Sequence, residues 1–186
     1  MQIDQSRQRA ICSLLSVAVG ILFFAAPIAV AGEALNKKED DTISSFSRWV
    51  IAADYAADGS LLVTAGGESL LYRPGDVVVW KSDGSRVGEL SGHPTAVWAV
   101  DVSSDGKLAA TAGYDGLVKV WDLQSRKLKA DLKQHKGWVR SLAFSPDGAR
   151  LASAGEDGKV FLWNTKDGKA AVTVEAHKGP ATAVAF

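Results

Sequence analysis

The sequence repeats itself with a fixed period. The segment HKGWVRSLAFSPDGARLASAGEDGKVFLWN, which begins at His135, lies 42 residues after HPTAVWAVDVSSDGKLAATAGYDGLVKVWD, which begins at His93. The pattern starts again as HKGPATAVAF at His177, and the two complete copies align without a gap. Self-similarity at such a period is typical of architectures in which each repeat is one small structural unit stacked on the next.

Each complete copy contains the signals of four short strands. The segments AVWAVDV and WVRSLAF are rich in β-branched and aromatic residues and end at a Ser-x-Asp-Gly turn, so we expect them to be the innermost strands. They are followed by KLAATAG and ARLASAG, by Asp-Gly turns at 115–116 and 157–158, by LVKVW and KVFLW, and by KLKADL and KAAVTV. The repeat region has no helical spacing of useful length, which predicts an all-β fold.

A diverged copy precedes these two. The Asp-Gly turn at 58–59 aligns with the turn at 147–148, which places the start of this copy near Ser47. Phe46 stands where the other copies have histidine, and Trp80 comes six residues late because the hairpin GGESLLYRPGD is longer. The first copy is expected to keep the strands but to lack the polar residues described below. The boundaries expected for the repeat region, 47–186, are about 47–92, 93–134 and 135–176, with a partial copy at 177–186.

A unit of about 40 to 45 residues that begins near Gly-His and ends at Trp-Asp resembles the WD-repeat β-propeller family. The resemblance implies four-stranded antiparallel blades, here three blades and the first strand of a fourth in an incomplete ring. Because propellers close with about four to eight blades, we expect a fragment of a larger propeller, of an exported, bacterial type.

The family resemblance also implies a hydrogen-bonded set of His, Ser or Thr, Asp and Trp within each blade. The matching residues are His93, Thr111, Asp115 and Trp121 in the second copy, and His135, Ser153, Asp157 and Trp163 in the third. This set resembles a hydrolase triad in composition only, because Ser153 lies within a strand, the Gly-x-Ser-x-Gly elbow is absent and the trio recurs in each blade. We therefore expect these tetrads to be structural and the protein not to be an enzyme.

Other kinds of site find little support. The three histidines occupy equivalent positions one blade apart, which is not the close spacing of a zinc site, and no sequence motif for a cofactor is present. The chain of 186 residues has 21 basic and 21 acidic side chains, without the basic stripe of nucleic-acid-binding proteins. We expect no cofactor, no metal and no nucleic-acid partner.

The resemblance places partner contacts on the propeller rim, where the loop before each innermost strand lies beside the turn between the second and third strands. The candidate residues are Trp49, Trp98, Tyr114, Trp138, Arg140 and Glu156. Trp, Tyr and Arg are enriched at interface hot spots, which favours a protein or peptide partner. Alternatively, Trp49 and Trp138 only fill the space between blades.

Two functions remain open from the sequence. The first is an exported, non-enzymatic propeller that acts as a protein-interaction scaffold. The second is an accessory or sensing propeller of a larger exported enzyme or redox protein, with its chemistry encoded beyond Phe186.

The amino-terminal residues have the pattern of a targeting signal. Arg7 and Arg9 precede an apolar run that begins at Ile11, and Ala29-Val30-Ala31 matches a cleavage site, so residues 1–31 are expected to be a signal peptide for export to the periplasm or the outside. Residues 32–46 then form a charged linker. The alternative is an uncleaved membrane anchor at 11–31, which would be the chain's only membrane contact.

Overall fold

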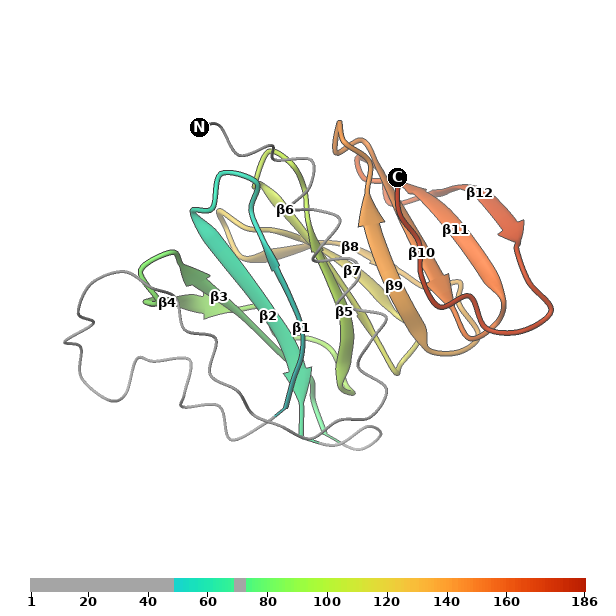
Figure 1. The fold of residues 1–186 in the computed structure, drawn as a ribbon, viewed down its shortest axis with the longest axis horizontal. Helices are drawn as coiled ribbons and strands as arrows, with labels where there is room; N and C mark the ends of the chain where they lie inside the picture. Colours follow the sequence, from blue (N-terminus) through green and yellow to red (C-terminus); the bar gives the residue numbers. More distant parts are fainter. Residues whose placement is uncertain (1–48, 69–72) are drawn as a thin grey trace, which may run out of the picture.

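The computed structural model describes residues 49–68 and 73–186. These residues form three antiparallel sheets of four strands each, and no helix is found among them (Figure 1). The strands of the first sheet are β1 (Trp49–Tyr55), β2 (Leu61–Gly67), β3 (Asp76–Lys81) and β4 (Arg86–Glu89). Those of the second are β5 (Val97–Val102), β6 (Leu108–Gly113), β7 (Val118–Asp122) and β8 (Lys127–Leu132). Those of the third are β9 (Val139–Phe144), β10 (Arg150–Gly155), β11 (Lys159–Asn164) and β12 (Ala170–Glu175).

The all-β prediction and the four-stranded blades are confirmed. Within each sheet the strands follow chain order, so each blade is a simple meander of hairpins. The first strands β1, β5 and β9 lie next to one another in the middle of the molecule, and the blades fan outward from them without closing into a ring (Figure 1). The signal peptide, the alternative anchor and the linker predicted for 1–46 lie outside the described residues.

The tight turns follow from the Ser-x-Asp-Gly sequences. Gly148, in the turn between β9 and β10, has a φ of 68°, a left-handed conformation that glycine adopts without steric cost. The Ser145 hydroxyl donates to Asp147 Oδ1 at 2.5 Å, and the Asp147 carboxylate accepts the Ala149 N–H at 3.0 Å. The side chains of the turn therefore satisfy its own polar groups, as expected of Asp-containing turns.

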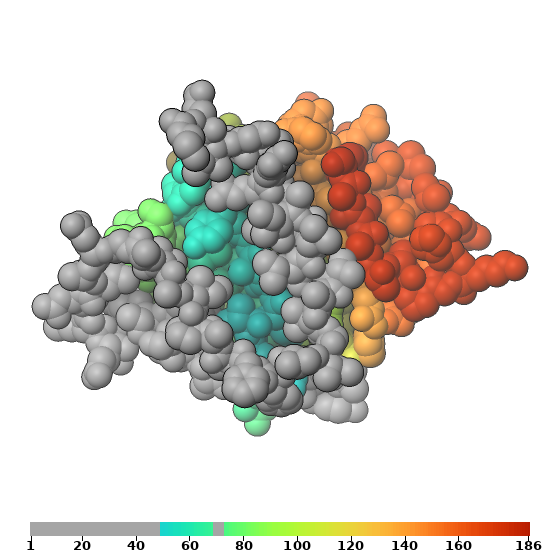
Figure 2. All heavy atoms as spheres, viewed as in Figure 1, coloured from blue at the N-terminus to red at the C-terminus, as the bar shows by residue number. Residues whose placement is uncertain are grey.

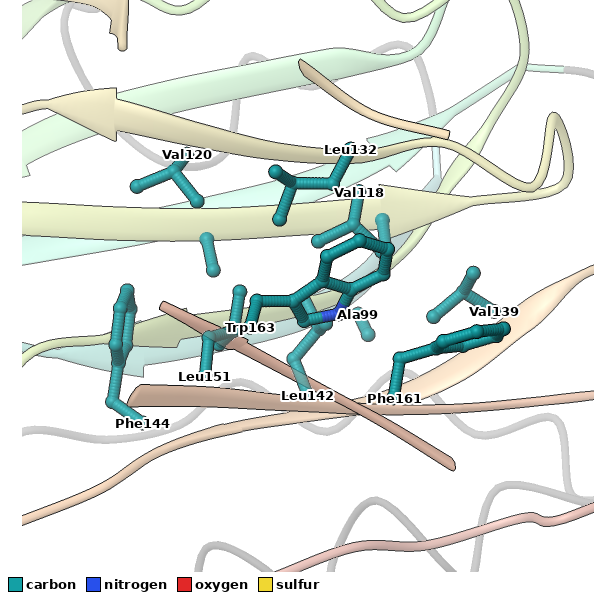
Figure 3. Close-up of a cluster of buried hydrophobic side chains, with 12 residues drawn as sticks. Ala99, Val118, Val120, Leu132, Val139, Leu142, Phe144, Leu151, Phe161 and Trp163 are labelled. Carbon is teal, nitrogen blue, oxygen red and sulfur yellow. The ribbon is translucent and has the colours of Figure 1, made fainter. Parts of the chain in front are cut away.

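The core lies between the blades, where small side chains of one sheet meet large side chains of the next. Between blades two and three, Ala110, Ala112 and Val118 share one buried cluster with Phe161 and Trp163 (Figure 3). A second cluster, between blades one and two, contains Trp121 and Val79. Because the sheets pack face to face, the combination of small and large residues lets adjacent blades approach closely.

The carboxyl-terminal residues differ from the prediction. Residues 180–186 were expected to form the first strand of a fourth blade, but they are not in a strand. They nevertheless run beside blade three, where the Ala181 N–H donates to the Gly155 carbonyl at 2.9 Å and the Val184 N–H donates to the Ser141 hydroxyl at 3.2 Å (Figures 1 and 2). A strand requires a hydrogen-bonded ladder, and among the described residues no second strand of a fourth blade supplies one.

Residues 177–179 precede this segment without regular structure. Ala181 corresponds to Val139 in the 42-residue register, and both side chains are buried. The chain therefore enters the next blade position at the place that the register predicts, although without a strand.

Candidate functional site

In blade two the four polar side chains aligned by the repeat lie in one hydrogen-bonded chain. His93 Nδ1 is 3.0 Å from Asp115 Oδ2, and His93 Nε2 is 2.9 Å from the Thr111 hydroxyl. The Trp121 indole N–H donates to the same hydroxyl at 2.7 Å. The network joins the loop before β5 to β6, to the turn after it and to β7.

Blade three repeats this geometry. His135 Nδ1 lies 3.0 and 3.1 Å from the two carboxylate oxygens of Asp157, and His135 Nε2 lies 2.8 Å from the Ser153 hydroxyl. The Trp163 indole N–H donates to Ser153 at 2.8 Å. Because the Asp157 carboxylate can only accept, its hydrogen bond places a proton on His135 Nδ1.

The arrangement Asp–His–Ser in blade three also defines what chemistry it can perform. A nucleophilic serine must present its oxygen to a substrate, with oxyanion donors close to the reacting carbon. Ser153 is completely buried, and its hydroxyl is held between His135 and the Trp163 indole. This geometry satisfies buried polar groups, and it leaves the serine oxygen without access to a substrate.

The Asp157 carboxylate collects several donors at the end of the network. Burial disfavours its ionised form and is the largest single influence, but hydrogen bonds from the backbone N–H groups of Lys136 and Lys159 and from His135 hold its pKa below the ordinary value of 3.8. The charged carboxylate is therefore the form that the folded blade stabilises.

Blade one keeps half of this network. The Trp80 indole N–H donates to the Thr64 hydroxyl at 2.9 Å, and both side chains are buried. The expectation that blade one lacks the polar set is therefore wrong for this pair. The long hairpin delays Trp80 in the sequence, but β3 pairs with β2 so that Trp80 lies opposite Leu62 and the indole still reaches Thr64.

The structure brings together five of the six candidate rim residues, which we call the rim cluster: Trp98, Tyr114, Trp138, Arg140 and Glu156. The rings of Trp98 and Tyr114 meet edge to face with centroids 6.0 Å apart, and those of Tyr114 and Trp138 are 3.6 Å apart. The Arg140 guanidinium carbon lies 5.9 Å from the Trp98 ring and 5.4 Å from the Trp138 ring. These distances are within the range of cation–π attraction.

The sixth candidate lies apart. Trp49 is at the start of β1, opposite Gly67, and 64% of its surface is exposed. It is the blade-one counterpart of Trp138, whose ring contacts Tyr114 of the preceding blade, and among the described residues no blade precedes blade one to supply such a ring.

An ion pair fixes the cationic side chain of the rim cluster. Arg140 donates from Nε to Glu156 Oε1 at 2.8 Å and also from Nη2 to the same oxygen. Both side chains are about one third exposed. Burial raises the pKa of the Tyr114 hydroxyl above its ordinary value. The positive charge of Arg140 opposes this increase, and the negative charge of Glu156 adds to it.

Comparison with known proteins identifies the repeat. The family model "WD domain, G-beta repeat" matches residues 84–122 and 126–164. Both matches end at the last residue of the third strand of a blade, directly after the tetrad tryptophan. The chain belongs to the WD-repeat propeller family. Each WD repeat of this chain thus begins near the outer strand of one blade and ends in the next blade, so the repeats link neighbouring sheets covalently.

The curated relatives of this WD-repeat chain include subunits of a translation factor. This chain is 30% identical to eukaryotic translation initiation factor 3 subunit I of Phaeosphaeria nodorum over 86 residues, and these residues are 46% of this chain and 24% of the relative. It is 33% identical to the protein of the same name from Scheffersomyces stipitis over 73 residues, and these residues are 39% of this chain and 19% of the relative. The matched segment is thus about a quarter or less of each relative.

Solved structures show the same fold. "Structure of U3-55K" has a TM-score of 0.68 and 21% identity, covering 75% of this chain and 43% of that chain. "Crystal structure of RRP9 WD40 repeats" gives the same TM-score and identity, covering 75% and 42%. At this level of identity the likeness concerns the fold alone.

The predicted export of this WD-repeat chain is wrong. The curated relatives are named as subunits of a translation initiation factor, and translation is initiated inside the cell. The apolar run that suggested export lies in 1–31, outside the described residues. Among the residues that are described, none forms a helix long and apolar enough to cross a membrane. The bacterial-type assignment is not tested.

Sequence reasoning missed three charged residues in the blades. Asp54 Oδ2 accepts the Val102 N–H at 2.7 Å, and Asp101 Oδ2 accepts the Phe144 N–H at 2.6 Å, so each carboxylate joins one innermost strand to the next. Lys119 is buried in β7 and its ammonium group lies 3.1 Å from Asp131 Oδ1. The signal for the two aspartates is their equivalent place in successive copies, immediately before the last residue of β1 and β5.

Proposed function

We propose that this WD-repeat chain is a non-enzymatic scaffold that binds a protein or peptide partner at the rim cluster. WD-repeat propellers bind protein partners, and the curated relatives are subunits of a multi-subunit factor by name. The single observation that carries the proposal is the contact of Trp98, Tyr114, Trp138, Arg140 and Glu156 across two blades. The cluster combines partly exposed aromatic rings with a held ion pair, which is the composition of interface hot spots.

The two tetrads support the non-enzymatic part of the proposal. Buried polar groups cost free energy unless they are paired, and each tetrad pairs the groups that it buries. The resemblance to a catalytic triad ends at the serine or threonine, because Ser153 and Thr111 are completely buried. We assign the tetrads to the stability of blades two and three.

A pull-down experiment tests the site. The tagged full-length chain is used as bait in lysate of the source cells, and capture is compared among wild type, Arg140→Ala and Tyr114→Ala. Truncation of a hot-spot residue typically costs about 2 kcal/mol or more, so we expect about thirtyfold weaker capture of a specific partner by both variants.

The matched control is Trp49→Ala, which removes an exposed aromatic residue outside the cluster and should capture the partner as wild type does. Circular dichroism and thermal unfolding confirm that each variant is folded before the comparison. If Arg140→Ala and Tyr114→Ala retain the partner at wild-type yield, the rim cluster is not the binding site.

A further inference from the structure

We propose that the rim cluster binds a proline-rich segment in the polyproline II conformation. This inference rests on the proposed function and adds the chemical class of the partner. It starts from the polar groups of the cluster that have no partner within the described part of the chain.

The rim cluster offers more hydrogen-bond donors than acceptors. The indole N–H groups of Trp98 and Trp138, the Tyr114 hydroxyl and the Nη1 group of Arg140 have no hydrogen-bond partner among the described residues, and none of these atoms is an unsatisfied buried group. On the acceptor side, Glu156 Oε2 is open and the Tyr114 oxygen can also accept. A complementary ligand should therefore be richer in acceptors than in donors.

A proline-rich segment has this property. Proline has a backbone carbonyl but no N–H, and in the polyproline II conformation the carbonyls point outward without internal hydrogen bonds. Domains that recognise such segments do so in grooves lined by aromatic side chains, which pack against the proline rings. Trp98, Tyr114 and Trp138 supply three aromatic rings in sequence, in contact from Trp98 to Tyr114 and from Tyr114 to Trp138.

The charges of the cluster disfavour other ligands. A ligand cation would compete for ring faces that the Arg140 guanidinium already approaches at 5.9 and 5.4 Å. An acidic segment would be repelled by the Glu156 carboxylate, which already binds Arg140 through two donors. Single-stranded RNA also stacks on aromatic rings, but its binding depends on free basic charge along the phosphates, and here Glu156 neutralises the cluster's cation.

The cluster is also held in place before a ligand arrives. The ion pair fixes Arg140 against two rings, and the Tyr114 and Trp138 rings, which come from neighbouring blades, contact each other closely. A preformed site loses little side-chain freedom on binding, and a polyproline II ligand is itself stiff. Both partners therefore lose little entropy, which suits recognition of a short segment.

Fluorescence anisotropy of the full-length chain tests the ligand class. The probes are a labelled dodecaproline peptide, a labelled dodecapeptide of alternating alanine and glutamine, and a labelled uridine dodecanucleotide. We expect binding of dodecaproline, about tenfold or more tighter than binding of either other probe. Trp138→Ala should weaken it about thirtyfold, and Tyr114→Phe, which removes only the hydroxyl, about five- to tenfold.

Trp49→Ala is the matched control and should bind dodecaproline with wild-type affinity. Tyr114→Phe keeps the inference testable if Trp138→Ala does not fold, because it changes a single oxygen. Equal binding of the proline and the alanine–glutamine peptides, or tighter binding of the RNA, would overturn the proposal, as would dodecaproline binding that Trp138→Ala and Tyr114→Phe leave unchanged.

The pull-down separates the two proposals. If the rim variants lose a captured protein but dodecaproline does not bind, the ligand class is wrong and the binding site stands. If neither assay depends on the rim cluster, both proposals are wrong.

Discussion

The tetrads show how one residue can hold a blade together. Asp157 lies at the turn between β10 and β11 and accepts hydrogen bonds from His135 and from the Lys136 and Lys159 backbone N–H groups. Its removal would leave the His135 ring, which is buried, without its Nδ1 partner. Losing one partner of a buried group is costlier than the net value of the bond, because the remaining group is desolvated and unpaired.

We therefore expect Asp157→Ala to lower the free energy of unfolding by about 1–3 kcal/mol, measured by urea denaturation. The control is Glu68→Ala, at the matching turn of blade one. Glu68 forms an ion pair with Arg73 in which both side chains are about half exposed, so its loss should cost less than about 1 kcal/mol. Equal losses for the two variants would contradict the role assigned to the tetrad.

The same carboxylate predicts a dependence on acid pH. The pKa of Asp157 is lower in the folded chain than its ordinary value of 3.8, so the stabilisation from its ionised form is present above that value and is lost as the pH falls through the folded pKa. Asp157→Asn keeps an acceptor but removes the titration. We expect the free energy of unfolding to fall less steeply below about pH 4 in this variant than in wild type. Parallel curves for the two proteins would show that Asp157 does not titrate on unfolding.

At the scale of the strand, the links between blades are as important as those within them. Asp54 joins β1 to β5, and Asp101 joins β5 to β9, each through the N–H of a residue at the end of the next innermost strand. In the third copy Ala143 takes the place of Asp101, and the next segment is joined by the Ser141 hydroxyl instead. Two carboxylates thus tie β1, β5 and β9 to one another, and a hydroxyl ties the carboxyl-terminal segment to β9.

Asp101→Ala should lower the free energy of unfolding by about 1.5–3 kcal/mol, the range for a hydrogen bond to a charged group. Asp167→Ala is the matched control, because Asp167 also accepts a backbone N–H, from Lys169 at 3.0 Å, but only within its own turn. Its loss should cost less than about 1 kcal/mol because it leaves the contact between blades intact. Guanidinium denaturation measures the free energy of unfolding of both variants. If Asp101→Ala loses no more of it than Asp167→Ala does, the hydrogen bond between the blades does not stabilise the chain.

The strands were predictable because their alternation and turns are local signals. The contents of each sheet follow from β-branched runs separated by Asp-Gly turns, and the register of blades two and three follows from their gap-free period. The Thr64–Trp80 pair escaped because six extra residues in the hairpin shift Trp80 out of the period, although strand pairing restores its place. The interblade bonds of Asp54 and Asp101 escaped because each joins residues more than 40 positions apart, and no local pattern marks such a contact.

The candidate site was predictable in position but not in contact. The register placed Trp98, Tyr114, Trp138, Arg140 and Glu156 on one rim, but which side chain meets which depends on the packing of blade three on blade two. In this packing the Trp138 ring contacts the Tyr114 ring, and Arg140 binds Glu156 of its own blade. Trp49 is separate from this group because it lies on blade one, whereas the cluster forms between blades two and three. The prediction of an accessory domain in a larger enzyme stays untested.

At the scale of the whole molecule, the three blades present unequal faces. Blade three covers the Ala and Val face of blade two, including Val118 and Leu132. The corresponding face of blade three carries Val172 and Val174 on β12, and these side chains are 45% and 44% exposed. Figure 2 shows the carboxyl-terminal segment over part of this blade, and β12 extends past it at the margin of the described molecule (Figures 1 and 2).

This open face predicts concentration-dependent self-association. An exposed apolar sheet face beside an unpaired edge strand is a common site of association between chains, and charged residues, especially lysine, prevent it. Sedimentation velocity over a wide range of protein concentration should show the wild-type chain increasing in mass, while the double variant Val172→Lys, Val174→Lys stays monomeric. Leu128→Lys is the control, because Leu128 is equally exposed, at 45%, on the outer strand of blade two, and that variant should associate as wild type does. A wild-type chain that remains monomeric at every concentration would mean that this face does not drive association. A Leu128→Lys variant that also stays monomeric would mean that added charge, and not the blade-three face, controls association.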